Sequence, residues 1–146
     1  MENFSRRETA LSLAWLLLWI ALGVFGLYAH NLVLPYIFLM YSALNCFAHL
    51  YLSCTRCSFF GRPCCLMGGM LSERFFKARH RGPMDPDDSI SEALWLIQGV
   101  FPIPFLLYYQ DWLMFAAYSA LAYGWFYYRK KFICRKCGNE WCVKKK

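Results

Sequence analysis

The chain has 146 residues, of which 59% are hydrophobic, 20% aromatic and only 17% charged, a composition too apolar for a small water-soluble domain. The formal net charge of +7 would suit a nucleic-acid-binding protein, but the positions of the basic residues favour a membrane surface, so we expect no nucleic-acid partner. Eight cysteines could form the disulfide framework of a secreted domain, but the long apolar runs exclude such a scaffold.

Four apolar runs follow one another as two pairs. They cover residues 9–28, 32–53, 93–109 and 112–128. The first two runs are long enough to cross about 30 Å of hydrocarbon, and the last two, at 17 residues each, lie at the short end of the spanning range. Because only a few residues separate the members of each pair, each pair predicts a helical hairpin. We therefore expect an all-α integral membrane protein, a single membrane domain of four transmembrane helices arranged as two hairpins.

The basic residues lie on one side of these expected helices. All 16 lysines and arginines precede residue 9, lie within residues 54–92 or follow residue 128, and the two hairpin tips contain none. The positive-inside rule then places both termini and the central segment in the cytoplasm. The basic segments are expected to contact anionic lipid headgroups of the bilayer.

The two halves of the chain share an order of features. The tetrapeptide YSAL occurs at 41–44 and again at 118–121, and each copy is followed by a C-x-x-C pair. This order suggests an internal duplication, a common plan among membrane proteins. Small residues recur at every fourth position of the last run, at Ala116, Ala120 and Gly124, and predict a close-packing face.

Seven of the cysteines fall in the basic segments 54–92 and 129–146. They are Cys54, Cys57, Cys64, Cys65, Cys134, Cys137 and Cys142. In a reducing compartment, C-x-x-C pairs bind metals or perform redox chemistry more often than they form lasting disulfides. The local stretch Cys134-Arg-Lys-Cys137-Gly138 resembles half of a zinc ribbon, in which two thiolates grip one tetrahedral ion.

A half-site requires a second pair of ligands, and Cys54 with Cys57 is the natural donor. Both C-x-x-C pairs follow the end of an expected helix on the same side of the membrane. We therefore expect a Cys₄ zinc site of Cys54, Cys57, Cys134 and Cys137 that clamps one hairpin to the other. A closed Cys₄ site has no open position for chemistry, which favours a non-enzymatic structural or adaptor role with a membrane-protein partner.

The remaining cytoplasmic thiols keep other functions open. Cys64, Cys65 and Cys142 are candidates for additional ligands or for reactive thiols. Reactive thiols would indicate a membrane thiol-redox or metal-handling protein. A cluster of iron and sulfide bound by cysteines would instead indicate an electron carrier.

Polar residues recur at three- and four-residue spacing in the second run. They are Ser42, Asn45, Cys46, His49 and Ser53. Polar groups in a membrane usually face other helices, so we expect interhelical hydrogen bonds. The alternative is a polar path through Asn45, Cys46 and His49 that leads to the cysteines. No carboxylate accompanies the stripe, which favours the hydrogen bonds.

Residues 66–81 predict an amphipathic helix at the membrane interface. Met67, Met70, Leu71, Phe75 and Ala78 fall on one face of this helix, and Arg74, Lys77, Arg79 and Arg81 surround the other.

Overall fold

The computed structural model describes residues 4–57, 59–62, 64, 66–79 and 86–133. The described residues form helices and connecting turns, and none of them lies in a strand, so the expectation of an all-helical protein is confirmed over this part of the chain. The α-helices are α1 (Arg6–Tyr28), α2 (Leu34–Leu52), α3 (Gly68–Phe75), α4 (Pro86–Val100), α5 (Ile103–Tyr108) and α6 (Trp112–Tyr128). A 3-10 turn, η1 (Cys54–Arg56), follows α2, and a π-helical turn, η2 (Arg129–Ile133), extends α6.

Within the part of the chain that the structure describes, three helical stretches are long and apolar enough to cross a membrane. They are Arg6–Tyr28, Leu34–Arg56 and Ser89–Tyr108. Many large apolar side chains on these helices point outward, which is the pattern expected where the surrounding solvent is lipid. The length and apolar character of the three stretches indicate association with a membrane.

Local hydrogen bonds set where the first two helices begin. Ser5 and Glu8 form a capping box: the Ser5 hydroxyl accepts from the Glu8 backbone N–H, and the Glu8 carboxylate accepts from the Ser5 N–H. This cap extends α1 three residues beyond the uncharged run. The Asn31 side chain accepts from the Val33 N–H at 2.7 Å, and Pro35 lies in the first turn of α2, so this helix begins later than expected.

The third expected helix is two helices in the structure. Proline has no backbone N–H, so Pro102 cannot donate to the Gln98 carbonyl four residues earlier. The helix breaks at this proline into α4 and α5. The Tyr118 hydroxyl of α6 donates to the Gln98 carbonyl at 3.2 Å and replaces the missing bond.

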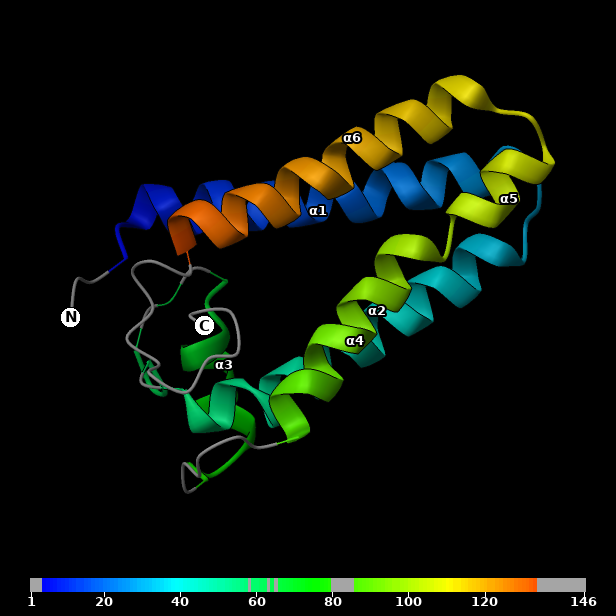
Figure 1. Ribbon diagram of the computed structural model, residues 1–146. Coiled ribbons are helices and arrows are strands. Elements are labelled where there is room, and N and C mark those ends of the chain that lie inside the picture. The colour runs from blue at the N-terminus through cyan, green and yellow to red at the C-terminus, as the bar shows by residue number, and fades with distance from the viewer. Residues whose placement is uncertain (1–3, 58, 63, 65, 80–85, 134–146) are drawn as a thin grey trace.

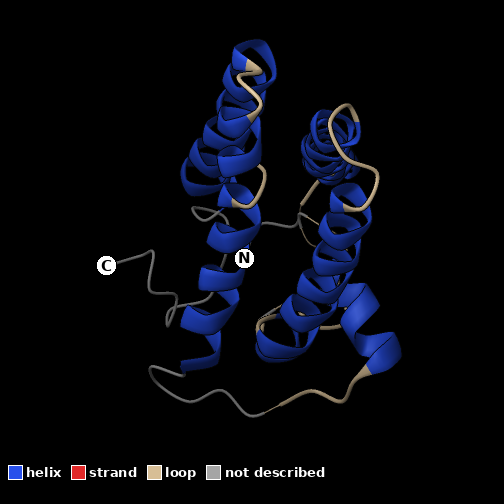
Figure 2. Cartoon of the chain, turned by 90° about the vertical axis from the view of Figure 1, so that its right-hand side faces the viewer, coloured by secondary structure: helices blue, strands red, loops and turns tan. Residues whose placement is uncertain are grey.

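The two hairpins lie side by side as two layers (Figure 2). Within each hairpin the arms diverge from the tip, so that α1 lies beside α6 and α2 lies beside α4 (Figure 1). At the tips, His30 Nε2 lies 3.3 Å from Asp111 Oδ2, and the His30 ring stacks on Tyr109 with the ring centroids 4.4 Å apart. The tips are therefore joined across the two layers.

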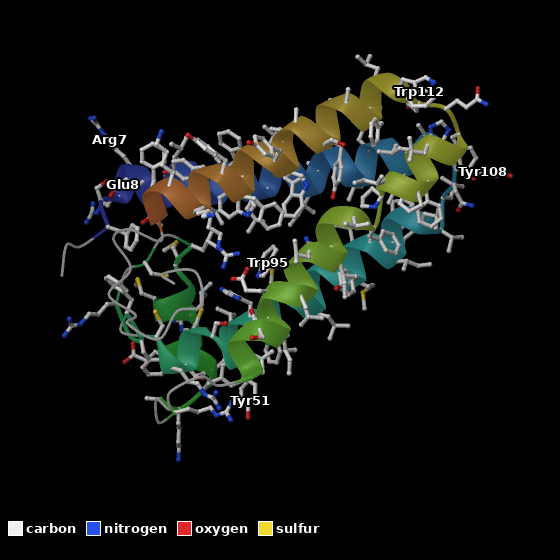
Figure 3. All side chains as sticks on the ribbon, viewed as in Figure 1. Arg7, Glu8, Tyr51, Trp95, Tyr108 and Trp112 are labelled. Carbon is white, nitrogen blue, oxygen red and sulfur yellow. The ribbon has the colours of Figure 1, made fainter. Side chains whose placement is uncertain are left out.

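Large aromatic side chains fill the space between the arms. Trp19, Tyr118 and Trp125 are almost fully buried, and Trp95 points from α4 toward the α1–α6 pair (Figure 3). The rings of Trp19 and Trp95 stack with centroids 6.4 Å apart, which ties the two arms together.

The two YSAL segments do not occupy equivalent positions. In the first copy Ser42 is the buried residue, whereas in the second copy it is Tyr118. The buried position has therefore moved by one residue, about 100° around a helix. The two tyrosine hydroxyls nevertheless donate to the same helix, Tyr41 to the Leu94 carbonyl and Tyr118 to the Gln98 carbonyl.

Candidate functional site

The first cysteines lie in a compact turn at the open end of the molecule, which is the end opposite the hairpin tips, where the arms are apart (Figure 1). η1 carries Cys54 directly after α2, and the Cys57 N–H donates to the Cys54 carbonyl at 3.2 Å. Gly61 then takes a positive φ of 73°, a backbone conformation that favours glycine, and the chain turns back toward α3. The Arg79 N–H closes the segment by donating to the Thr55 carbonyl at 3.0 Å.

Cys54 and Cys64 converge at the first turn of α3. A Cβ atom on Gly68 would lie 2.8 Å from Cys54 Sγ and 3.8 Å from Cys64 Sγ, so both sulfurs border the space that this glycine leaves free. The Gly69 N–H donates to Cys64 Sγ at 3.2 Å. A backbone N–H aimed at sulfur stabilises the thiolate form, which is the form that binds metals and reacts with disulfides.

The turn around these sulfurs is tightly packed. A Cβ on Gly69 would lie only 2.0 Å from the Phe59 carbonyl oxygen, so glycine is required where α3 crosses the 59–62 turn. Phe59 is buried and contacts Phe4 edge to face, with the ring centroids 5.4 Å apart. The backbone that carries the thiols is therefore held in place by close contacts.

The cysteine turn and the end of α6 lie near each other along α1. The Thr9 hydroxyl donates to the Cys64 carbonyl at 3.1 Å, and the Trp15 ring stacks on Tyr128 with centroids 6.2 Å apart. Thr9 and Trp15 are six residues apart on one helix, or about 9 Å along its axis. From Tyr128 the chain continues through η2 to Ile133, the residue before Cys134.

The structure places the predicted site residues unequally. Cys54 is buried, and Cys57 and Cys64 are half-buried, within the turn just described. Cys65, Cys134, Cys137 and Cys142 lie outside the described residues. Among the residues that are described, no three His, Cys, Asp or Glu side chains come together as a metal site. The proximity of Cys54 and Cys64 depends on the chain reversal at Gly61 and on the close fit of Gly69 against Phe59, and the C-x-x-C spacing does not predict it.

The polar stripe of α2 faces α4. Asn45 Nδ2 donates to Gln98 Oε1 and, at 3.2 Å, to the Leu94 carbonyl. Gln98 Nε2 donates to Ser42 Oγ at 3.1 Å. Gln98 and Asn45 are almost fully buried, so each amide satisfies part of the other's hydrogen-bonding demand in an apolar setting. Gln98 is the only residue with a side-chain amide within residues 93–109. This feature of the sequence could have indicated its role.

The stripe continues toward the open end of the molecule. His49 Nδ1 and Ser91 Oγ share a hydrogen bond at 2.7 Å, and the His49 ring meets Trp95 edge to face. Cys46 lies among apolar neighbours at the edge of the core. These contacts are helix–helix contacts, and a polar path through Asn45, Cys46 and His49 stays a prediction.

An ion pair connects the arms near the same end. The Arg129 guanidinium, at the start of η2, donates to the Glu92 carboxylate of α4, and both side chains are partly buried. Together with the Trp19–Trp95 stack, this pair links the α1–α6 arm to the α2–α4 arm.

Comparison with known protein families, curated proteins and solved structures finds no match to this chain.

Proposed function

We propose that this chain is a small polytopic membrane protein whose two hairpins are clamped by a zinc-type Cys₄ site, and that its role is structural or adaptor-like. The proposed ligands are Cys54, Cys57, Cys134 and Cys137. The observation that carries the proposal is the compact turn that holds Cys54 and Cys57 after α2, in which the Cys57 N–H donates to the Cys54 carbonyl at 3.2 Å. The Gly69 N–H donated to Cys64 Sγ makes Cys64, which also borders Gly68, a candidate for an additional ligand, because backbone donors orient thiolates and stabilise them around a metal.

The position of Ile133 supports the clamp. The cysteine turn contacts α1 at Thr9, and the end of α6 contacts α1 at Trp15, about 9 Å farther along the helix. The chain then runs through the five residues of η2 before Cys134. A second pair of thiolates from this segment would join α2 to α6, which lie on different arms of the molecule.

We also propose that α6 crosses the membrane as the fourth span. Its 17 residues cover about 25 Å, and it lies beside α1 along its length (Figure 1). Four crossings place both termini on one side of the membrane. The basic residues favour the cytoplasm for that side, where the reducing environment keeps thiols available for zinc.

A second candidate function rests on the same pair of sulfurs. Cys54 and Cys64 both border Gly68, and two thiols that can approach each other form a redox pair. In this alternative they would pass two electrons and two protons to the disulfide of a partner protein, and Cys54 and Cys64 would become a disulfide. A metal-handling protein or an iron–sulfur carrier would use the same cysteines with a different bound group.

The deciding experiment is elemental analysis of the full chain, purified in detergent without added metal, together with an ultraviolet–visible spectrum. We expect about one zinc per chain. The zinc should be lost in Cys54→Ser and in Cys134→Ser, and it should be retained in Cys46→Ser, the control within α2. Loss in Cys64→Ser would add Cys64 to the ligand set.

Other outcomes identify the alternatives. Iron with sulfide and a coloured protein would replace the zinc proposal with electron transfer. A metal-free protein in which Cys54 and Cys64 form a disulfide on mild oxidation would favour the redox pair. A metal-free protein whose thiols all titrate freely would rule out the clamp.

A further inference from the structure

The short helix α3 has its apolar face turned outward. Gly68, Gly69 and Ser72 are buried against the rest of the molecule, whereas the large apolar side chains on the other face are exposed. These exposed residues are Met67, Met70, Leu71 and Phe75. Met70, Leu71 and Phe75 lie on α3 and are exposed, as the sequence predicts, but the helix is shorter than residues 66–81, so Met67 and Ala78 lie outside it. It starts after Met67, which is in the left-handed conformation, and it ends at the extended Phe76.

The exposed face of α3 continues onto the outer surface of α2. Phe47 is half-exposed on α2, and its ring meets Phe75 and Phe76 edge to face, with centroids 6.5 and 5.2 Å apart. Phe47 lies five residues before Leu52, the end of α2, which is about 7.5 Å along the helix. Helices that lie in the membrane plane bury their apolar faces about 5–10 Å into the headgroup and acyl boundary. The depth of Phe47 therefore matches that of an in-plane helix.

Basic side chains lie on this face and next to it: Arg74 follows Met70 by one helical turn, and Lys77 and Arg79 come after the end of α3. Arg74 and Lys77 are exposed, and the Arg79 guanidinium lies over the Tyr51 ring, 4.7 Å from its centroid. Tyr51, on the last turn of α2, is shown in Figure 3. Tyrosine and arginine at the end of a spanning helix are typical of the headgroup level, where the ring contacts lipid tails and the cation contacts phosphates.

We propose that α3 lies in the plane of the membrane surface, with its apolar face in the bilayer and its basic residues on anionic phospholipid headgroups. The occupant of the exposed face is thus the lipid of one leaflet. The continuity with Phe47 and the positive charge of the surrounding residues carry this assignment. It is independent of zinc, since none of the residues involved is a cysteine.

The test uses a photoreactive residue in the full chain. Leu71→p-benzoylphenylalanine and Phe75→p-benzoylphenylalanine are reconstituted into vesicles of equal phosphatidylcholine and phosphatidylglycerol, and the adducts are identified by mass. Glu73→p-benzoylphenylalanine is the control, because the exposed Glu73 lies off the apolar face. We expect lipid adducts from positions 71 and 75 and few from position 73. Phosphatidylglycerol adducts should exceed phosphatidylcholine adducts about fivefold or more, the factor that one basic residue near a surface supplies.

A variant without two of the basic side chains distinguishes binding of these side chains to lipid headgroups from burial of the apolar face of α3 alone. In Arg74→Gln/Lys77→Gln the ratio of the two lipid adducts should fall toward one, while total lipid labelling persists. Arg6→Gln/Arg7→Gln removes the same charge from the start of α1 and should keep the ratio. Adducts between two copies of the chain would show that α3 is an oligomer interface. Equal labelling from position 73, or none from 71 and 75, would also overturn the proposal.

Discussion

Tyr118 compensates for a hydrogen bond that Pro102 removes. The Gln98 carbonyl lacks its helical donor because proline has no N–H, and the Tyr118 hydroxyl from α6 supplies one at 3.2 Å. Tyr118 is fully buried, so no solvent can replace it. A single side chain thus allows the helix to break without leaving a buried acceptor unpaired.

Tyr118→Phe should therefore lower the free energy of unfolding by about 1–2 kcal/mol. Pro102→Ala restores a backbone N–H to the Gln98 carbonyl, so Tyr118→Phe should cost less in that background. Tyr41→Phe is the control, because the Leu94 carbonyl also accepts from Asn45 Nδ2. Unfolding of all four variants in mixed micelles measures this coupling. An equal cost of Tyr118→Phe in both backgrounds would show that the two residues are not coupled.

Single residues differ in how well the sequence predicts their contacts. The stripe at Ser42, Asn45 and His49 is predictable because helical spacing places these polar side chains on one face. Helical spacing does not predict their partner Gln98, because a single polar side chain in an apolar helix shows no periodicity. Cys64 comes close to Cys54 because the chain reverses at Gly61 and Gly69 fits against the Phe59 carbonyl, and those contacts form only in three dimensions.

One glycine of α6 lies in a close contact with α1. A Cβ on Gly124 would lie 2.7 Å from Trp15 Cζ2, and the Trp15 indole N–H donates to the Leu121 carbonyl at 3.2 Å. Ala116 and Ala120, which share the expected small-residue face, are exposed. Only Gly124 of the three thus provides the close approach that the every-fourth-residue pattern predicts.

Gly124→Val should displace Trp15 and destabilise the fold by about 1–3 kcal/mol. Ala120→Val places the same new side chain on an exposed side of the same helix and should change stability by no more than about 0.5 kcal/mol. Thermal unfolding followed by tryptophan fluorescence compares the two variants, since Trp15 itself reports the change. A larger loss for Ala120→Val would mean that the exposed small face is the one used in packing.

The helices are the best-predicted elements, and their ends are the worst. Long uncharged runs predict α1 and α2 because only helices satisfy their backbone in lipid. The capping box at Ser5 and the proline at 102 then move the boundaries. The expected helix over 66–81 loses most of its length at its C-terminal end, where the extended Phe76 ends α3, while Gly68 and Gly69 lie in its first turn and allow the tight crossing over the 59–62 turn.

At the scale of the whole molecule, the number of crossings fixes the side on which each terminus lies. Four crossings return the C-terminus to the side of the N-terminus, and three do not. We expect a C-terminal green fluorescent protein fusion to be fluorescent in a bacterial host and a C-terminal alkaline phosphatase fusion to be inactive. Fusions at Gln110, the tip before α6, should behave in the opposite way. An active phosphatase at the C-terminus would leave α6 outside the set of spanning helices.

The sequence predicts the two hairpins but not how they pair. Hairpin connections are short, so consecutive helices must be neighbours at the tips. The contacts of α1 with α6 and of α2 with α4 arise from the fit of Trp15 to Gly124 and of Asn45 to Gln98, which no local pattern contains. Neither the YSAL segments nor their spacing specifies these partners.

The pairing of α2 with α4 also sets an order of events during synthesis. Asn45 and Gln98 are 53 residues apart, so at ribosomal speeds of about 5–20 residues per second α2 is made about 3–10 s before its partner. During that interval Ser42, Asn45 and His49 have no α4 to bond with. The nascent first hairpin is thus a suitable substrate for a membrane insertase or chaperone. Such a protein would shield the polar side chains until the second hairpin has been synthesised.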